Sequence, residues 1–87
     1  MEITLTIENK AGLHARPAAL FAQKASAFKS TIIILKGKKS INAKSIIGIM
    51  GLGVKQGDSL LLKIEGPDAE EAATTLEKLV TTNFGEE

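Results

Sequence analysis

The residues best suited to chemistry lie in the stretch Gly12-Leu13-His14-Ala15-Arg16-Pro17, which contains the only imidazole of the chain. Pro17 fits the first turn of a helix predicted from Arg16 to Phe28, so His14 would lie just before the helix begins. Backbone N–H groups at a helix start form a site for anions, and the Arg16 guanidinium can hold phosphate oxygens. Because a neutral imidazole is a nucleophile near pH 7, this stretch predicts a covalent phosphoryl carrier.

His14 could also be an ordinary helix-start residue without chemistry, and the charge distribution argues against that interpretation. No Asp or Glu lies between Asn9 and Gln56. Residues 1–56 carry a net charge of +7 from nine basic and two acidic residues, whereas residues 57–87 carry −6 from two basic and eight acidic ones. A fold that gathers the basic residues on one face would attract acidic or phosphorylated partners.

Four segments have the composition of strands. Apolar residues alternate with polar ones from Ile3 to Ile7, which is the period of a strand with one buried face. Thr31–Leu35 and Lys38–Ala43 are predicted to form a hairpin that turns at Gly37. The alternation returns from Ser59 to Glu65 and predicts the fourth strand.

Two further segments are predicted to be helical. Ser45–Leu52 is apolar but holds two glycines, so it is expected to form a helix of two turns that packs on another element. A closing helix is predicted from an apolar stripe, with Asp68 and Glu71 as a capping-box-like pair and Gly85 as its stop. The members of the stripe are Ala69, Ala72, Ala73, Leu76, Leu79, Val80 and Phe84.

The element order β-α-β-β-α-β-α predicts an α+β fold. We expect a two-layer open-faced sandwich, in which three helices cover one face of a four-stranded antiparallel sheet. A chain of 87 residues is the size of one small domain, so residues 1–87 are expected to form a single unit.

Ser45 directly precedes the short predicted helix and is expected to be its N-cap. Gly48 stands at the third helical position in place of Glu, so no capping box supports this residue. A phosphate added to Ser45 would bring a charge of about −2 to the surface that a partner contacts. The serine is therefore also a candidate regulatory site.

The stretch around His14 resembles the active-site signature of HPr, the histidine-containing phosphocarrier family of the phosphoenolpyruvate-dependent sugar phosphotransferase system. Lys44-Ser45-Ile46-Ile47-Gly48-Ile49-Met50 resembles the second signature of that family, and the likeness extends over essentially the whole chain. It implies that His14 receives the phosphoryl group on Nδ1 from phosphorylated Enzyme I and passes it to a histidine of IIA domains of sugar permeases. The residues implied to surround the phosphate are Ala15, Arg16, Pro17 and Ala18.

The resemblance also implies a docking surface and regulation. The predicted docking residues are Ala19, Ile46, Ile47 and Met50, although a two-turn helix must bury one side, so Ile46, Ile47, Ile49 and Met50 could each belong to the core instead. Modification of Ser45 by HPr kinase/phosphorylase is implied to hinder phosphorylation at His14 and to favour binding to a catabolite-control repressor.

Composition and sequence pattern also bear on cofactors, cellular location and alternative functions. With no Cys and one His, the chain is expected to use no metal and no cofactor. The resemblance to HPr implies a carrier rather than an enzyme. The short apolar runs and the absence of a signal-peptide pattern predict a cytoplasmic protein. A monomer is expected, because the predicted elements leave no long apolar edge exposed. A regulatory-only relative, active in catabolite control or a nitrogen-related phosphorelay, is one alternative. A nucleic-acid-binding module is weaker, because Phe21 and Phe28 are predicted to lie in the core.

Overall fold

The computed structural model describes residues 1–85, which form four strands, three α-helices and a final 3-10 turn. The elements are β1 (Glu2–Thr6), α1 (Ala15–Ser26), β2 (Thr31–Lys36), β3 (Lys39–Asn42), α2 (Ile46–Gly51), β4 (Ser59–Glu65), α3 (Ala69–Thr81) and η1 (Asn83–Gly85). None of the helices within residues 1–85 is long and apolar enough to cross a bilayer.

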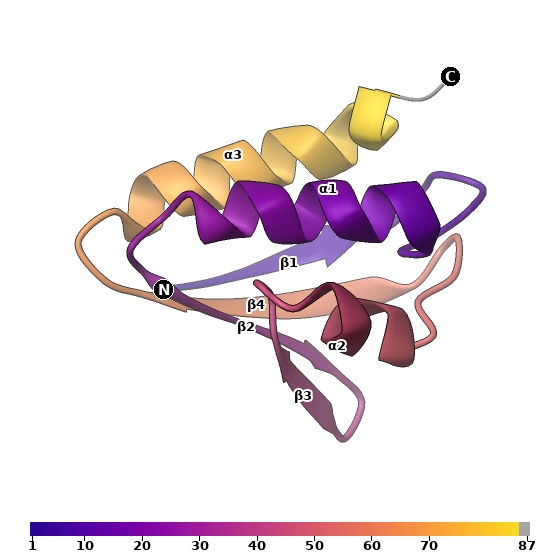
Figure 1. Ribbon diagram of the computed structural model, residues 1–87, viewed down its shortest axis with the longest axis horizontal. Coiled ribbons are helices and arrows are strands. Elements are labelled where there is room, and N and C mark those ends of the chain that lie inside the picture. The colour runs from indigo at the N-terminus through magenta and orange to yellow at the C-terminus, as the bar shows by residue number, and fades with distance from the viewer. Residues whose placement is uncertain (86–87) are drawn as a thin grey trace.

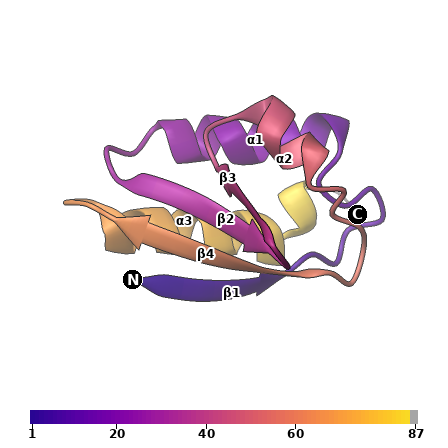
Figure 2. The ribbon, with the colours of Figure 1, turned by 90° about the horizontal axis from the view of Figure 1, so that it is seen from below.

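The four strands form one sheet in the order β1-β4-β2-β3, and every neighbouring pair is antiparallel. Leu5 lies opposite Leu60, and Ile34 lies opposite both Leu62 and Ile41. All three helices lie on one side of the sheet, as Figures 1 and 2 show. The predicted α+β open-faced sandwich is therefore confirmed.

The core lies between the sheet and the helices. Alternate residues of β2 and β4 are fully buried, in β4 as its period-two pattern predicts, and they belong to one core cluster with apolar residues of α1 and α3 such as Phe21 and Leu76. Burial of a large apolar side chain contributes about 1.5–3 kcal/mol, so this layer fixes the positions of α1 and the sheet.

Both long helices are shorter than the sequence predicts. Helix α1 ends at Ser26, because the N–H groups of Ala27 and Phe28 turn back to carbonyls three residues earlier, and Phe28 is only partly buried beyond the helix. Helix α3 ends at Thr81, and Phe84 reaches the core from the 3-10 turn with φ 57°. The last turn of α1 therefore tightens, whereas α3 ends because Asn83 and Phe84 adopt left-handed φ angles of 53° and 57°.

The predicted capping role of Asp68 is wrong. Asp68 occupies the N-cap position of α3, but its side chain makes no cap hydrogen bond. Its carboxylate instead accepts hydrogen bonds from the N–H of Lys29 at 2.8 Å, the N–H of Ser30 at 2.9 Å and the Ser30 hydroxyl at 2.5 Å. The residue therefore links the start of α3 to the turn between α1 and β2.

Candidate functional site

His14 lies at the N-cap of α1, as its position before the predicted helix indicates. Its backbone is extended, with φ −126° and ψ 151°, and its exposed side chain makes no cap hydrogen bond. The helix has no acidic residue in its first turn. The imidazole is thus open to solvent beside a helix whose own first turn holds no carboxylate.

The loop before His14 is held against the segment that follows α2. Gly12 has φ +63°, and a Cβ at this position would lie 2.3 Å from the carbonyl oxygen of Val54. The N–H of Leu13 donates to that carbonyl at 3.2 Å, and the side-chain amide of Asn9 donates to the Gly12 carbonyl at 3.0 Å. Only glycine permits this close approach together with this backbone conformation.

Ala15 has φ +46°, in the left-handed region that residues with a Cβ seldom adopt. Such a conformation costs roughly 1–2 kcal/mol and marks local backbone strain. Regular helical geometry therefore begins after Ala15. The sequence contains no signal for this feature, since alanine is the residue that most favours a helix.

The first turn of α1 leaves several groups available to an anion. An α-helix provides no internal acceptor for the N–H groups of its N-cap and first three residues. In α1 these donors come from His14, Ala15 and Arg16, because Pro17 has no N–H. The Arg16 side chain is exposed and makes no ion pair or hydrogen bond within residues 1–85. Pro17 and Ala18 are buried.

Helix α2 begins at Ser45, whose hydroxyl oxygen accepts a hydrogen bond from the N–H of Gly48 at 3.0 Å. The predicted N-cap is therefore confirmed. The serine is exposed although it makes this bond.

The structure decides which apolar residues of α2 belong to the core. Ile49 is fully buried, whereas Ile47 is 84% exposed, Ile46 45% and Met50 37%. Ala19 of α1 is half-buried, and α1 and α2 contact each other. Ile46, Ile47 and Met50 together form what we call the α2 patch, an exposed apolar surface of the kind that marks protein interaction sites.

Comparison with known proteins gives one consistent result. The family model for the "PTS HPr component phosphorylation site" matches residues 1–82. The chain is 44% identical over 84 residues to phosphocarrier protein HPr of Treponema pallidum, covering 97% of this chain and 96% of that protein. It is also 46% identical over 76 residues to the HPr-like protein Crh of Halalkalibacterium halodurans, covering 87% and 90% of the two chains.

Solved structures agree with this result. The crystal structure of HPr-C-His from Thermoanaerobacter tengcongensis has a TM-score of 0.97 and 56% identity, and the match covers 100% of this chain and 98% of that one. The chain belongs to the HPr family. Its role is that of a phosphocarrier in the phosphotransferase system.

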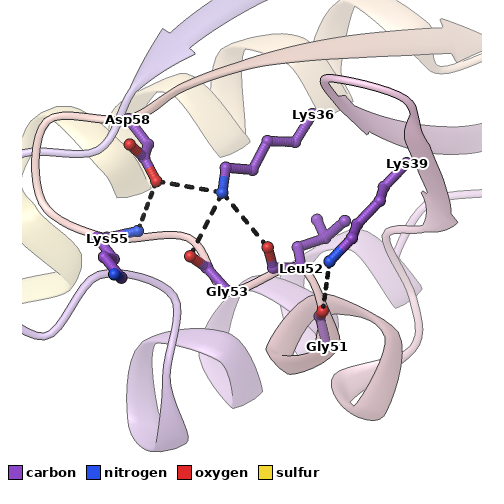
Figure 3. Close-up of polar contacts among 7 residues, drawn as sticks. All are labelled: Lys36, Lys39, Gly51, Leu52, Gly53, Lys55 and Asp58. Atoms are coloured by element: carbon purple, nitrogen blue, oxygen red, sulfur yellow. Dashed lines mark hydrogen bonds and ion pairs between the residues drawn. The ribbon is translucent and has the colours of Figure 1, made fainter.

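One part of the HPr fold around the site could not be found from the sequence. Lys36 and Lys39 of the β2–β3 hairpin donate to backbone carbonyls at the end of α2, as Figure 3 shows. These residues are 12 to 17 positions away from their acceptors. Lysines in a basic segment look alike in sequence, so only the fold distinguishes a lysine with a structural contact from a solvated one.

Proposed function

We propose that His14 is the residue of this chain that carries the phosphoryl group. Its Nδ1 attacks the phosphorus of the group on phosphorylated Enzyme I, the bond between phosphorus and Enzyme I breaks, and the reverse exchange delivers the group to a histidine of a IIA domain. The open position of the imidazole at the start of α1 is the observation that carries this proposal. A covalent carrier needs such access because two different partners must reach the same atom.

The first turn of α1 supplies the surroundings of the phosphoryl group. Ala15 and Arg16 contribute N–H donors, Arg16 adds a guanidinium that pairs with no carboxylate of residues 1–85, and Pro17 and Ala18 form the buried base of the turn. Donors placed where negative charge gathers stabilise the transferring group.

The partners are proposed to dock on the α2 patch and Ala19, next to the acceptor. Helices α1 and α2 contact each other, so the apolar residues and His14 belong to neighbouring elements. Exposed apolar area at the centre of a small interface provides binding without slow release, which a shuttle between Enzyme I and IIA domains requires.

The direct test is phosphorylation with labelled phosphoenolpyruvate and Enzyme I. The wild-type protein should take up one acid-labile, base-stable phosphoryl group, and His14→Ala should take up none while keeping its circular dichroism spectrum. Label that persists in the folded His14→Ala variant would contradict the assignment.

Ser45 is proposed as the regulatory site. An HPr kinase/phosphorylase modifies it, and a catabolite-control repressor binds the modified protein. It is exposed and lies beside the α2 patch, so a phosphate there would change the charge of the docking surface. Incubation with the kinase and ATP should add one phosphate to the wild type and none to Ser45→Ala. The modified protein should accept label at His14 more slowly.

A regulatory-only role is a second candidate, favoured by the likeness to the HPr-like protein Crh. Replacement of His14 in the host separates the two. Loss of sugar uptake supports transport, whereas unchanged uptake with altered transcription supports regulation alone.

The remaining features of the proposal concern the whole chain. Residues 1–87 act as one carrier domain in the cytoplasm, as a protein substrate rather than an enzyme, with no cofactor and no nucleic acid. The protein works as a monomer, although a 56% identical relative has a structure described as an HPr dimer from Thermoanaerobacter tengcongensis. Sedimentation at working concentration distinguishes the two states.

A further inference from the structure

The C-terminal end of α2 is held by lysines from another part of the chain. The Lys36 Nζ lies 3.4 Å from the carbonyl oxygens of both Leu52 and Gly53, and the Lys39 Nζ lies 3.4 Å from that of Gly51 (Figure 3). Helix α2 has no basic residue in its own last turn. The β2–β3 hairpin thus supplies the donors that a helix end requires.

Lys36 also contacts the loop that follows α2. Its Nζ lies 3.4 Å from Oδ2 of Asp58, and the same oxygen accepts a hydrogen bond from the N–H of Lys55 at 2.8 Å. The Lys36 and Asp58 side chains are only 30% and 35% exposed. The hydrogen bond from the Lys55 N–H, and then the hydrogen bond and charge of Lys36, hold the pKa of Asp58 below its usual range, so this carboxyl group is ionised at neutral pH.

The loop around Asp58 is hydrogen-bonded to the segment that leads from β1 to His14. The Asp58 carbonyl accepts from the N–H of Ile7 at 2.9 Å, and the N–H of Gly57 donates to the Ile7 carbonyl at 2.6 Å. Val54, in the same loop, accepts from Leu13. Lys36 therefore contacts the end of α2 and the loop 53–58, and this loop is hydrogen-bonded to Ile7 and Leu13, which both precede His14 in the chain.

We propose that Lys36 is a positioning residue for phosphoryl transfer. Through Asp58 and the carbonyls of Leu52 and Gly53, it holds the α2 patch and the His14 loop in one fixed arrangement that a partner meets already formed. A surface that must be ordered during docking binds more weakly than one that is ordered beforehand. The inference rests on the proposed role of His14 as the acceptor.

The test measures phosphoryl transfer from Enzyme I as the concentration of this protein is varied. Lys36→Met removes the ammonium group and keeps an unbranched side chain. We expect its KM to rise about 10-fold with kcat within about twofold of the wild type, because a docked partner restores the arrangement. Lys36→Arg, which keeps the charge and its donors, should return KM to within about threefold.

Lys38→Met is the matched control, because Lys38 lies in the turn of the same hairpin, is exposed and makes no hydrogen bond or ion pair within residues 1–85. It removes one positive charge and should change KM less than twofold. Equal rises in KM for Lys36→Met and Lys38→Met would show general charge attraction and would overturn the proposal. An unchanged KM for Lys36→Met, or an equal loss in kcat, would also overturn it.

Asp58→Asn provides a second route if Lys36→Met does not fold. The amide oxygen can still accept from Lys55, so the loop keeps its turn while Lys36 loses its charged partner. The proposal requires a rise in KM of about threefold, and an unchanged KM would refute it. A wild-type protein that takes no label at His14 would refute the proposed function instead, so the two failures are distinguishable.

Discussion

The two long helices begin at opposite ends of the molecule, and neither is capped by the side chain at its N-cap position (Figure 1). At the start of α3, the Asp68 carboxylate accepts three hydrogen bonds from Lys29 and Ser30, and the first turn contains Glu70 and Glu71. At the start of α1, His14 bonds to nothing in the first turn, which has no acidic residue.

This difference shows that the N-cap position of a helix can serve either stability or function. The α3 start supplies its own negative charge, and its N-cap side chain is used in a contact that joins distant turns. The α1 start leaves its N–H donors and Arg16 available to an anion. Strain at Ala15 is tolerated there because the surrounding backbone is fixed by Gly12 and Val54.

The largest expected effect comes from removing the free charge at the α1 start. Arg16→Ala should lower kcat/KM for phosphoryl transfer by about 100-fold, as is common when one group that stabilises transferring charge is lost. The side chain is exposed and unpaired in the described chain, so the melting temperature should stay within about 2 °C of the wild type. Transfer kinetics and a thermal scan on the same sample provide both values. Wild-type transfer rates in the variant would show that the α1 start is not specialised for phosphoryl transfer.

The next effect concerns the loop that places His14. Gly12→Ala forces a Cβ against the Val54 carbonyl at φ +63°, and should lower the free energy of unfolding by about 2–3 kcal/mol. Gly53→Ala is the control, because Gly53 has a similar φ of +67° but nothing within 4 Å of its added Cβ. Urea unfolding of both variants separates the contact from the backbone conformation. Equal losses would show that the close approach to Val54 contributes nothing.

A smaller effect is expected at the start of α3. Ser30→Ala removes one of the hydrogen bonds to Asp68 and leaves the two backbone N–H donors in place. The loss of one such bond should lower the melting temperature by about 4–8 °C in a domain of this size. Phosphoryl transfer at 25 °C should be unchanged, because the contact is remote from His14. A loss of transfer activity in this folded variant would mean that the two helix starts are not independent.

The smallest effect is a dependence on acid pH. The hydroxyl of Ser30, followed by the N–H of Lys29, holds the pKa of Asp68 below its usual range. A lowered pKa stabilises the fold at pH above the unfolded value of about 3.9, and this stabilisation disappears as the pH falls through the folded value.

The stability difference between wild type and Ser30→Ala should therefore shrink between about pH 5 and pH 2. Urea unfolding of both proteins across this range measures it. A constant difference would show that the bond from Ser30 does not depend on the ionised carboxylate.

Local sequence patterns predicted much of the fold and the placement of the site. Period-two alternation located β1 and β4, and the order of residues at 12–17 placed His14 at a helix start. Ser45 was predicted as an N-cap and is one. Each of these features depends on residues within a few positions of one another.

The features that the sequence missed depend on distant residues or on backbone geometry. Asp68 was predicted to form a capping box, yet its partners lie 38 and 39 positions away. The contacts of Lys36 with Leu52, and the burial of Phe84 from a 3-10 turn, also require the folded sheet and helices to be in place. Exposure of Ile47 rather than Ile49 was open until the side of α2 that faces the core was known.

The chain has a single histidine, and that ring is in solvent. In a proton NMR spectrum, its C2–H resonance has no other imidazole signal beside it, and nitrogen-15 labelling of histidine alone gives just two ring-nitrogen resonances. Phosphoryl loading and partner contact at this proposed acceptor can therefore be followed in real time on the native protein, without a reporter group and without assignment of the other resonances.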